Sequence, residues 1–172
     1  MRASLLPAPR LIVLAGGIAL GAVGLLFLPA AVPLFVTANL ILAGAALLDF
    51  LCTPRPRVLR VVRMAPERVG LLSSFEVVLR IASKASVAIR LRLLDTPPPE
   101  LQIVAGADWA GQVPAQGQVE GSYWVHSCVR GQCIWGPIHV RYGSLWGLWE
   151  RSLVVPGGQT VRIYPGLALA AT

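Results

Sequence analysis

The stretch SFEVVLRIASKASVAIRLRLLD, residues 74–95, decides the fold that this sequence predicts. Apolar side chains occupy every second position in its two halves: Phe75, Val77, Leu79 and Ile81, then Val87, Ile89, Leu91 and Leu93. Charged side chains such as Arg80 and Arg90 stand between them. A period of two is typical of a β-strand with one buried face. We therefore predict two half-buried antiparallel strands, separated by the turn-like SKAS.

Short strands of this kind continue through the rest of the chain. They are predicted at residues 58–64, 101–105, 118–129, 132–142, 150–156 and 159–165. The triple proline at 97–99 predicts an extended crossover, and the glycine-rich stretch 106–118 predicts a loop. About seven or eight short strands with turns at this spacing indicate an all-β immunoglobulin-like sandwich over residues 58–165, with an aliphatic core.

The part of the chain before this domain has the composition of a membrane anchor. Residues 11–28 and 34–52 are apolar runs, and a helix of either length would span roughly 27 Å, close to the thickness of a hydrocarbon core. Pro29 and Pro33 bracket a short uncharged turn between them. Residues 1–57 therefore predict an N-terminal tail, two transmembrane helices forming a hairpin, and a linker.

The charged residues predict how this hairpin is oriented. Residues 1–63 carry six arginines against one aspartate, a net charge of +5, whereas the rest carries nine basic and seven acidic residues, a net charge of +2. Arginines flank the hairpin at both outer ends and are missing from its turn, which places the β domain in the cytoplasm, at the plasma membrane. So small an excess on the domain argues against nucleic acid as a partner. The competing interpretation is that residues 1–31 form a cleavable signal peptide.

Few polar or small residues interrupt the apolar runs. Asp49, near the end of the second run, is expected to reach lipid headgroups or pair with an arginine. Thr37 and Asn39 are expected to hydrogen-bond between the helices. Gly17 and Gly21 are expected to let the first helix pack closely against the second.

The stretch HSCVRGQCIWGPIHVRYGSLWGLW, residues 126–149, raises the question of metal or redox chemistry. His126, Cys128, Cys133 and His139 are of the types that ligate zinc. With VRGQ as a hairpin turn, however, His139 lies about 20 Å along the strand from Cys133, too far for one shared ion. A disulfide between the two cysteines is geometrically easier. In the cytoplasm we expect both to be reduced, partly exposed thiols.

No other sequence pattern points to a reaction. The chain has neither G-x-S-x-G nor a phosphate-binding G-x-x-x-x-G-K-[ST]. Its five tryptophans could form an aromatic patch, but we expect them to pack in the core and at sheet edges. The sequence therefore predicts no catalytic residue, no cofactor-binding residue, no metal ligand and no small-molecule substrate.

The order of these segments, with several short motifs, resembles the N-terminal portion of bacterial membrane proteins that carry the domain of unknown function (DUF) 58. The motifs are ALLDFLCTPRP, RVLRVVR, GPIHVR, GSLWGLWER and VRIYPGL. The matching positions are Arg130, Gly131, Gly136, Pro137, Gly147, Leu148, Trp149, Tyr164 and Pro165. The chain departs from the family at Cys133, where an aromatic residue is usual, and at Leu145-Trp146, where proline followed by leucine or phenylalanine is usual.

The resemblance implies both a longer protein and a partner. In that family the Tyr-Pro strand leads into a C-terminal domain similar to von Willebrand factor type A, which this chain lacks. Residues 166–172 are therefore expected to be a truncated linker and the chain a fragment. The resemblance further implies a MoxR-type AAA ATPase as partner, in the assembly or maturation of other proteins.

We therefore predict a bilayer-anchored, non-enzymatic scaffold or interaction module with a protein partner. Two alternatives stay open. The β domain could be an extracytoplasmic binding or receptor domain with a Cys128–Cys133 disulfide. Alternatively, the chain could be a fragment of an enzyme whose site lies in the missing C-terminal domain.

Overall fold

The computed structural model describes residues 2–24 and 29–165, which form two compact units. The β unit contains residues 2–3, 55–141 and 153–165, and the helical unit contains residues 4–54, apart from 25–28, and 142–152. The last four residues of the predicted first span, 25–28, lie outside the described residues, as does the predicted linker 166–172.

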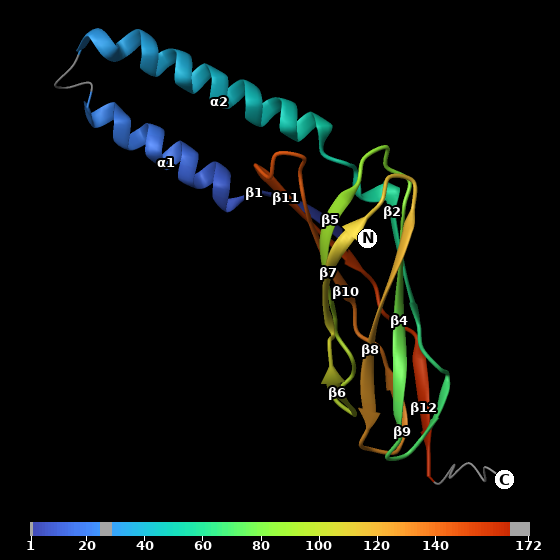
Figure 1. The fold of residues 1–172 in the computed structure, drawn as a ribbon. Coiled ribbons are helices and arrows are strands. Elements are labelled where there is room, and N and C mark those ends of the chain that lie inside the picture. The colour runs from blue at the N-terminus through green and yellow to red at the C-terminus, as the bar shows by residue number, and fades with distance from the viewer. Residues whose placement is uncertain (1, 25–28, 166–172) are drawn as a thin grey trace. The chain divides into compact units, whose positions relative to one another are not determined.

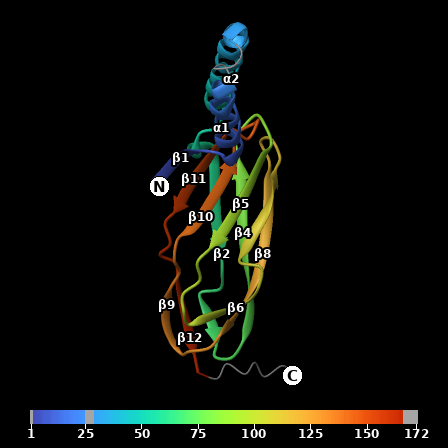
Figure 2. The same ribbon diagram turned by 90° about the vertical axis from the view of Figure 1, so that its left-hand side faces the viewer.

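A four-stranded antiparallel sheet forms one layer of the β unit (Figures 1 and 2). Its strands, in spatial order, are β2 (Leu59–Met64), β4 (Ser74–Ser83), β8 (Gln118–Ser127) and β6 (Leu101–Ala105). The central strand β4 pairs with β2 along its second half and with β8 over nearly its whole length. β6 is an edge strand, with an irregularity in its pairing to β8 between Ile103 and Ala105.

Strands of two further sheets complete the sandwich. One sheet has the order β3 (Arg68–Gly70), β12 (Thr160–Tyr164) and β9 (Gly131–Ile134), with β12 parallel to β3 and antiparallel to β9. In the other, β5 (Ile89–Asp95) lies between β10 (Ile138–Gly143) and β7 (Asp108–Val113).

The apolar core lies between the inner faces of these sheets. All four inward positions predicted in residues 74–83 are buried, as are Ile89, Leu91 and Leu93. Val87 precedes β5 and is exposed. Fully buried valines, among them Val113 and Val140, come from the opposing strands. The predicted all-β sandwich is therefore confirmed, while its immunoglobulin-like topology stays a prediction.

The pairing of strands after residue 126 differs from the prediction. β8 pairs with β4 and β6, whereas β9 pairs with β12 in another sheet. The hairpin predicted from residues 118–129 and 132–142 is therefore wrong, because residues 128–130 connect two sheets. Residues 106–118, predicted as a loop, contain β7. Alternation shows that a strand is present and which face it buries, but not its neighbour.

The helical unit contains two apolar helices, α1 (Pro9–Gly24) and α2 (Val32–Cys52) (Figure 1). A short 3₁₀ turn, Pro29–Ala31, leads into α2. The helical segment Val32–Val58, with mean hydropathy 2.0 over its apolar window, is long and apolar enough to cross a membrane. The described part of α1 is shorter than this. Residues 2–24 and 29–165 thus contain one candidate span, and the two-span hairpin stays a prediction.

The packing expected within the hairpin is not observed. A Cβ atom added at Gly17 or Gly21 would meet no atom within 4 Å, so neither glycine brings α1 close to α2. Thr37 Oγ1 donates to the Pro33 carbonyl (2.8 Å) and Asn39 Nδ2 to the Phe35 carbonyl (2.9 Å). Both polar side chains are therefore satisfied within their own helix, four residues back, which local geometry makes easy.

The remaining strands also belong wholly or partly to the helical unit. β1 (Arg2–Pro7) precedes α1, and β11 (Trp149–Val155) pairs with β1. Tyr142 and Gly143, at the end of β10, complete this part of the sheet. The sequence did not predict β1, because the alternation of polar and apolar side chains in its residues, RASLLP, stops after the fourth.

Candidate functional sites

Asp49, in the last turn of α2, is almost completely buried, with 1% of its surface exposed. Its Oδ1 accepts a hydrogen bond from the backbone N–H of Trp146 (2.9 Å), and its Oδ2 accepts one from the N–H of Leu148 (3.0 Å). The Ser144 hydroxyl also donates to Oδ2. We call residues 144–148 the junction loop. Three donors from one loop satisfy this carboxylate, as a buried charge requires.

The junction loop is closed by its own backbone. The Ser144 N–H donates to the Trp149 carbonyl (2.8 Å), and the Gly147 N–H donates to the Ser144 carbonyl (3.2 Å). The Trp149 N–H donates to Ser144 Oγ (3.0 Å). Gly147 has φ of +73°, a left-handed conformation that favours glycine. The loop is therefore a defined turn that places its N–H groups around Asp49.

Trp149 adds a second contact between this turn and α2. Its indole Nε1 donates to the Ala46 carbonyl (2.8 Å), and its ring meets Phe50 edge-on with 5.8 Å between ring centroids. The N–H of Ala8, just before α1, donates to the Leu148 carbonyl (2.8 Å). The helices and the junction loop thus form one hydrogen-bonded structure inside the helical unit.

The expectation that Asp49 reaches headgroups or pairs with an arginine is therefore wrong. Its partners lie 95 and more residues later in the chain, and they are mainly backbone N–H groups. The only sequence signal was one carboxylate near the end of an apolar helix. That signal indicates a need for partners but does not identify them.

A buried ion pair crosses the β unit between β2 and β5. Arg63 Nε donates to Asp95 Oδ2 (2.8 Å), and its Nη2 donates to Asp95 Oδ1 and to the Gly136 carbonyl (3.0 Å). The two side chains are 5% and 0% exposed. The guanidinium lies over the Trp135 ring, 4.7 Å from its centroid. Bidentate geometry and a stacked ring are the conditions under which a buried arginine is tolerated.

Tyr123 joins this cluster from β8. Its hydroxyl donates to Asp95 Oδ2 (2.6 Å). Burial, and then the hydrogen bond to the Asp95 carboxylate, raise the pKa of Tyr123 well above its usual range. The tyrosine therefore stays neutral and acts as a donor. Since every member is buried, the cluster ties three strands together and offers no access to a substrate.

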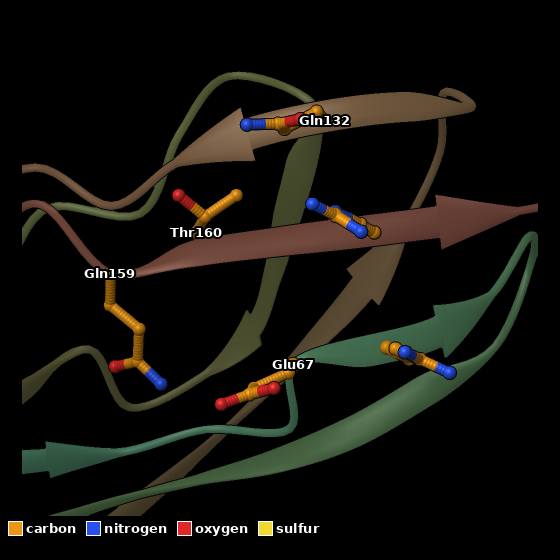
Figure 3. A pocket seen from close by; sticks show the side chains of 6 residues that line it. Glu67, Gln132, Gln159 and Thr160 are labelled. Atoms are coloured by element: carbon orange, nitrogen blue, oxygen red, sulfur yellow. The ribbon is translucent and has the colours of Figure 1, made fainter.

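A shallow polar cleft of about 360 Å³ lies over the β3–β12–β9 sheet (Figure 3). It is lined by Glu67, Arg68, Gln132, Gln159, Thr160 and Arg162. Arg68 and Arg162 are register partners on the parallel strands β3 and β12, so two positive charges are adjacent. Gln159 Nε2 donates to the Ala65 carbonyl (3.0 Å). The cleft offers guanidinium and amide groups for hydrogen bonding and contains no nucleophile paired with a base.

The outer face of the β2–β4–β8–β6 sheet carries an exposed apolar cluster. We call Val62, Met64, Val78 and Trp124 the outer cluster. Met64 pairs with Val78, which in turn pairs with Ser122, two residues from Trp124. Trp124 is 47% exposed. An outward-facing position in such a sheet is usually polar, so apolar side chains gathered here need an explanation.

The tryptophans thus divide between core and surface. Trp135 is 1% exposed and belongs to the core, whereas Trp124 and Trp146 are each about half exposed. The expectation that tryptophans pack into the core and sheet edges holds for Trp135 and not for Trp124. Alternation along β8 places Trp124 on the outer face, opposite to the inward Tyr123 and Val125.

The residues considered for zinc or a disulfide lie on separate elements. His126 is on β8, where its Nδ1 is 3.0 Å from Ser74 Oγ, and His139 is on β10. Cys128 is an exposed free thiol, whereas Cys133 is a buried free thiol on β9. Among the described residues, no group of three His, Cys, Asp or Glu side chains could hold a metal ion. The expectation of partly exposed thiols fits Cys128 and fails for Cys133.

Comparisons with known proteins leave this chain without an assigned family. No family model and no curated protein matches the sequence. One solved structure that these comparisons matched is that of WR4, a C. elegans MSP family member. It is 10% identical, the match covers 62% of this chain and 98% of that chain, and the TM-score is 0.36. A likeness at this level carries no argument about function.

Proposed function

We propose that this protein is a membrane-anchored, non-enzymatic interaction module that presents the outer cluster to a protein partner. The observation that carries the proposal is the half-exposed Trp124 on the same sheet face as the exposed or half-buried Val62, Met64 and Val78. Large aromatic and methionine side chains on an otherwise polar face are enriched in protein interfaces. The Arg80–Glu120 ion pair, on the same face, supplies a polar rim.

The anchor in this proposal is the two-span hairpin, with the N-terminal tail and an immunoglobulin-like β domain on the cytoplasmic side of the plasma membrane. The apolar helix α2 supports the anchor, and the placement of arginines supports the orientation. The resemblance to DUF 58 membrane proteins supplies the partner class, a MoxR-type AAA ATPase. In this proposal the chain takes part in the assembly or maturation of other proteins, a role that the same resemblance implies.

A photo-crosslinking amino acid at position 124 is expected to capture one defined protein in native membranes. A probe replacing Trp124 lies within the outer cluster and would be covered by any partner that buries it. Crosslinked products are resolved by gel and identified by mass spectrometry. Capture of an AAA ATPase would support the partner that the resemblance implies.

The matched control is the same probe at Arg90, an exposed position of β5 outside the outer cluster. We expect no defined product there. Equal products at both positions, or none at position 124 in cells that express the protein, would contradict the proposed interaction surface.

Cys128 is expected to be shielded from a membrane-impermeant maleimide in intact cells and to react after lysis. The thiol suits this test because it is exposed, whereas Cys133 is buried and reacts slowly. Burial, and then the charge of Glu100, raise the pKa of Cys133, which further lowers its thiolate fraction. The test uses a Cys52→Ala chain, so that Cys128 dominates labelling.

The control for orientation is Ala30→Cys in a chain that lacks Cys52 and Cys128. Residue 30 lies in the turn between the two apolar runs and is exposed. We expect it to react in the same intact cells in which Cys128 does not. Labelling of Cys128 without lysis would instead support the extracytoplasmic receptor domain.

A further inference from the structure

The junction loop presents two large apolar side chains to its surroundings. Leu145 is 64% exposed and Trp146 is 50% exposed. Their backbone is nevertheless held firmly, because the Trp146 and Leu148 N–H groups donate to the buried Asp49. A fixed loop that exposes leucine and tryptophan incurs a cost in water that a matching environment would remove.

The loop lies beside the last turns of the apolar helix α2. Asp49 is three residues before the final residue of α2, Cys52. Trp149, which follows the loop, reaches the Ala46 carbonyl, another three residues or about 5 Å toward the middle of the helix. On these turns α2 exposes Leu47, Leu48 and Leu51. Any bilayer that covers these leucines reaches the level of the junction loop.

Most backbone N–H groups of the junction loop are already satisfied. Those of Ser144, Trp146, Gly147 and Leu148 have acceptors within the helical unit, and that of Leu145 has none among the described residues. The Asp49 charge is covered by its three donors. Each satisfied polar group lowers the cost of bringing non-helical backbone close to the hydrocarbon.

We propose that the junction loop is a membrane-contacting element that inserts Leu145 and Trp146 into the interfacial layer of the bilayer, beside α2. The proposal rests on the membrane anchoring of α2 proposed above. Tryptophan favours this layer because its ring is apolar while its indole N–H can meet polar lipid groups. Arg10 contributes a cation at the same place, since its Nη1 lies 3.2 Å from the position of a Cβ added at Gly147. That guanidinium is suited to a lipid phosphate.

The test uses the full chain in vesicles of phosphatidylcholine and phosphatidylglycerol, with the fluorophore NBD on Leu145→Cys. Cys52 and Cys128 are replaced by alanine, and the buried Cys133 is left in place. Fluorescence is quenched either by lipids with a doxyl group near the headgroup or by aqueous iodide. We expect doxyl lipids to quench NBD at Leu145, and iodide to quench it at least about fivefold less than at an aqueous site.

Two labelled positions separate this inference from the membrane anchor itself. Val129→Cys, an apolar residue of the β unit with 53% exposure, serves as the aqueous site and should respond to iodide alone. Leu40→Cys, 68% exposed in the middle of α2, should respond to lipid quenchers alone. If lipid quenches the label at position 40 and only iodide quenches the label at position 145, the loop does not enter the bilayer. The inference would then be wrong, and a protein partner would be the better explanation for the exposed Leu145 and Trp146. If Leu40 also responds only to iodide, the proposed anchor itself fails.

Discussion

Replacing Arg63 by methionine is expected to lower the free energy of unfolding of the β unit by about 3–5 kcal/mol. The change removes a guanidinium that donates to both oxygens of Asp95 and to the Gly136 carbonyl. Methionine keeps much of the side-chain volume, so the loss reports mainly on charge and hydrogen bonds. Asp95 would stay buried with only Tyr123 and a local N–H as donors. An unpaired buried carboxylate is the main source of this cost.

The unfolding free energy is measured by urea titration of the full chain in a nonionic detergent, followed by near-ultraviolet circular dichroism. The matched control is Arg92→Met, which breaks the exposed pair with Asp108 and should cost far less, because water and salt screen exposed charges. The double variant Arg63→Met with Asp95→Leu should recover part of the loss, because it leaves no charge unpaired. If the Arg63 and Arg92 variants lost the same unfolding free energy, the stabilising role of the buried Arg63–Asp95 ion pair would be contradicted.

Replacing Asp49 by alanine is expected to open the junction loop and accelerate amide hydrogen exchange at Trp146 and Leu148. Both N–H groups and the Ser144 hydroxyl would lose their acceptor. Hydrogen bonds to a charged group contribute about 1.5–3 kcal/mol each, so protection should fall by about 100-fold. Asp49→Asn should have a smaller effect, because one side-chain oxygen can still accept.

Exchange is followed by mass spectrometry of peptides covering residues 143–149, in detergent or in vesicles. Asp108→Ala is the control, since its carboxylate is exposed and pairs only with Arg92. It should leave exchange in the junction loop unchanged. If Asp49→Ala also left protection unchanged, the carboxylate would not hold the loop, and the headgroup role expected from sequence would become the better explanation.

Much of the buried ion pair was visible in the sequence. Arg63 follows Leu59 and Val61 at an inward-facing position of β2, and Asp95 follows Leu93 at an inward-facing position of β5. A charged residue at an inward-facing position of a strand needs a partner of opposite charge. The alternation of apolar and polar residues along each strand could not show that β2 and β5 face each other across the core. Opposing faces are set by how the sheets stack.

The outer cluster was less predictable. Alternation along residues 118–127 separates Tyr123 and Val125 from Trp124, so the outward position of Trp124 followed from the same rule. The expectation of core and sheet-edge packing did not distinguish Trp124 from the buried Trp135. Met64 and Val78 come beside Trp124 only through the register of β2, β4 and β8. A register between separate strands depends on the whole sheet.

The sequence by itself determined the local character of each segment of this protein. Periods of two specified strands and their buried faces, and an uninterrupted apolar run specified a helix suited to a bilayer, because both follow from the geometry of adjacent residues. Only the tertiary structure decided which strands pair and which donors surround Asp49. Those donors lie at Ser144, Trp146 and Leu148, almost a hundred residues away. Contacts at such separations depend on the folded path of the chain, which no local pattern records.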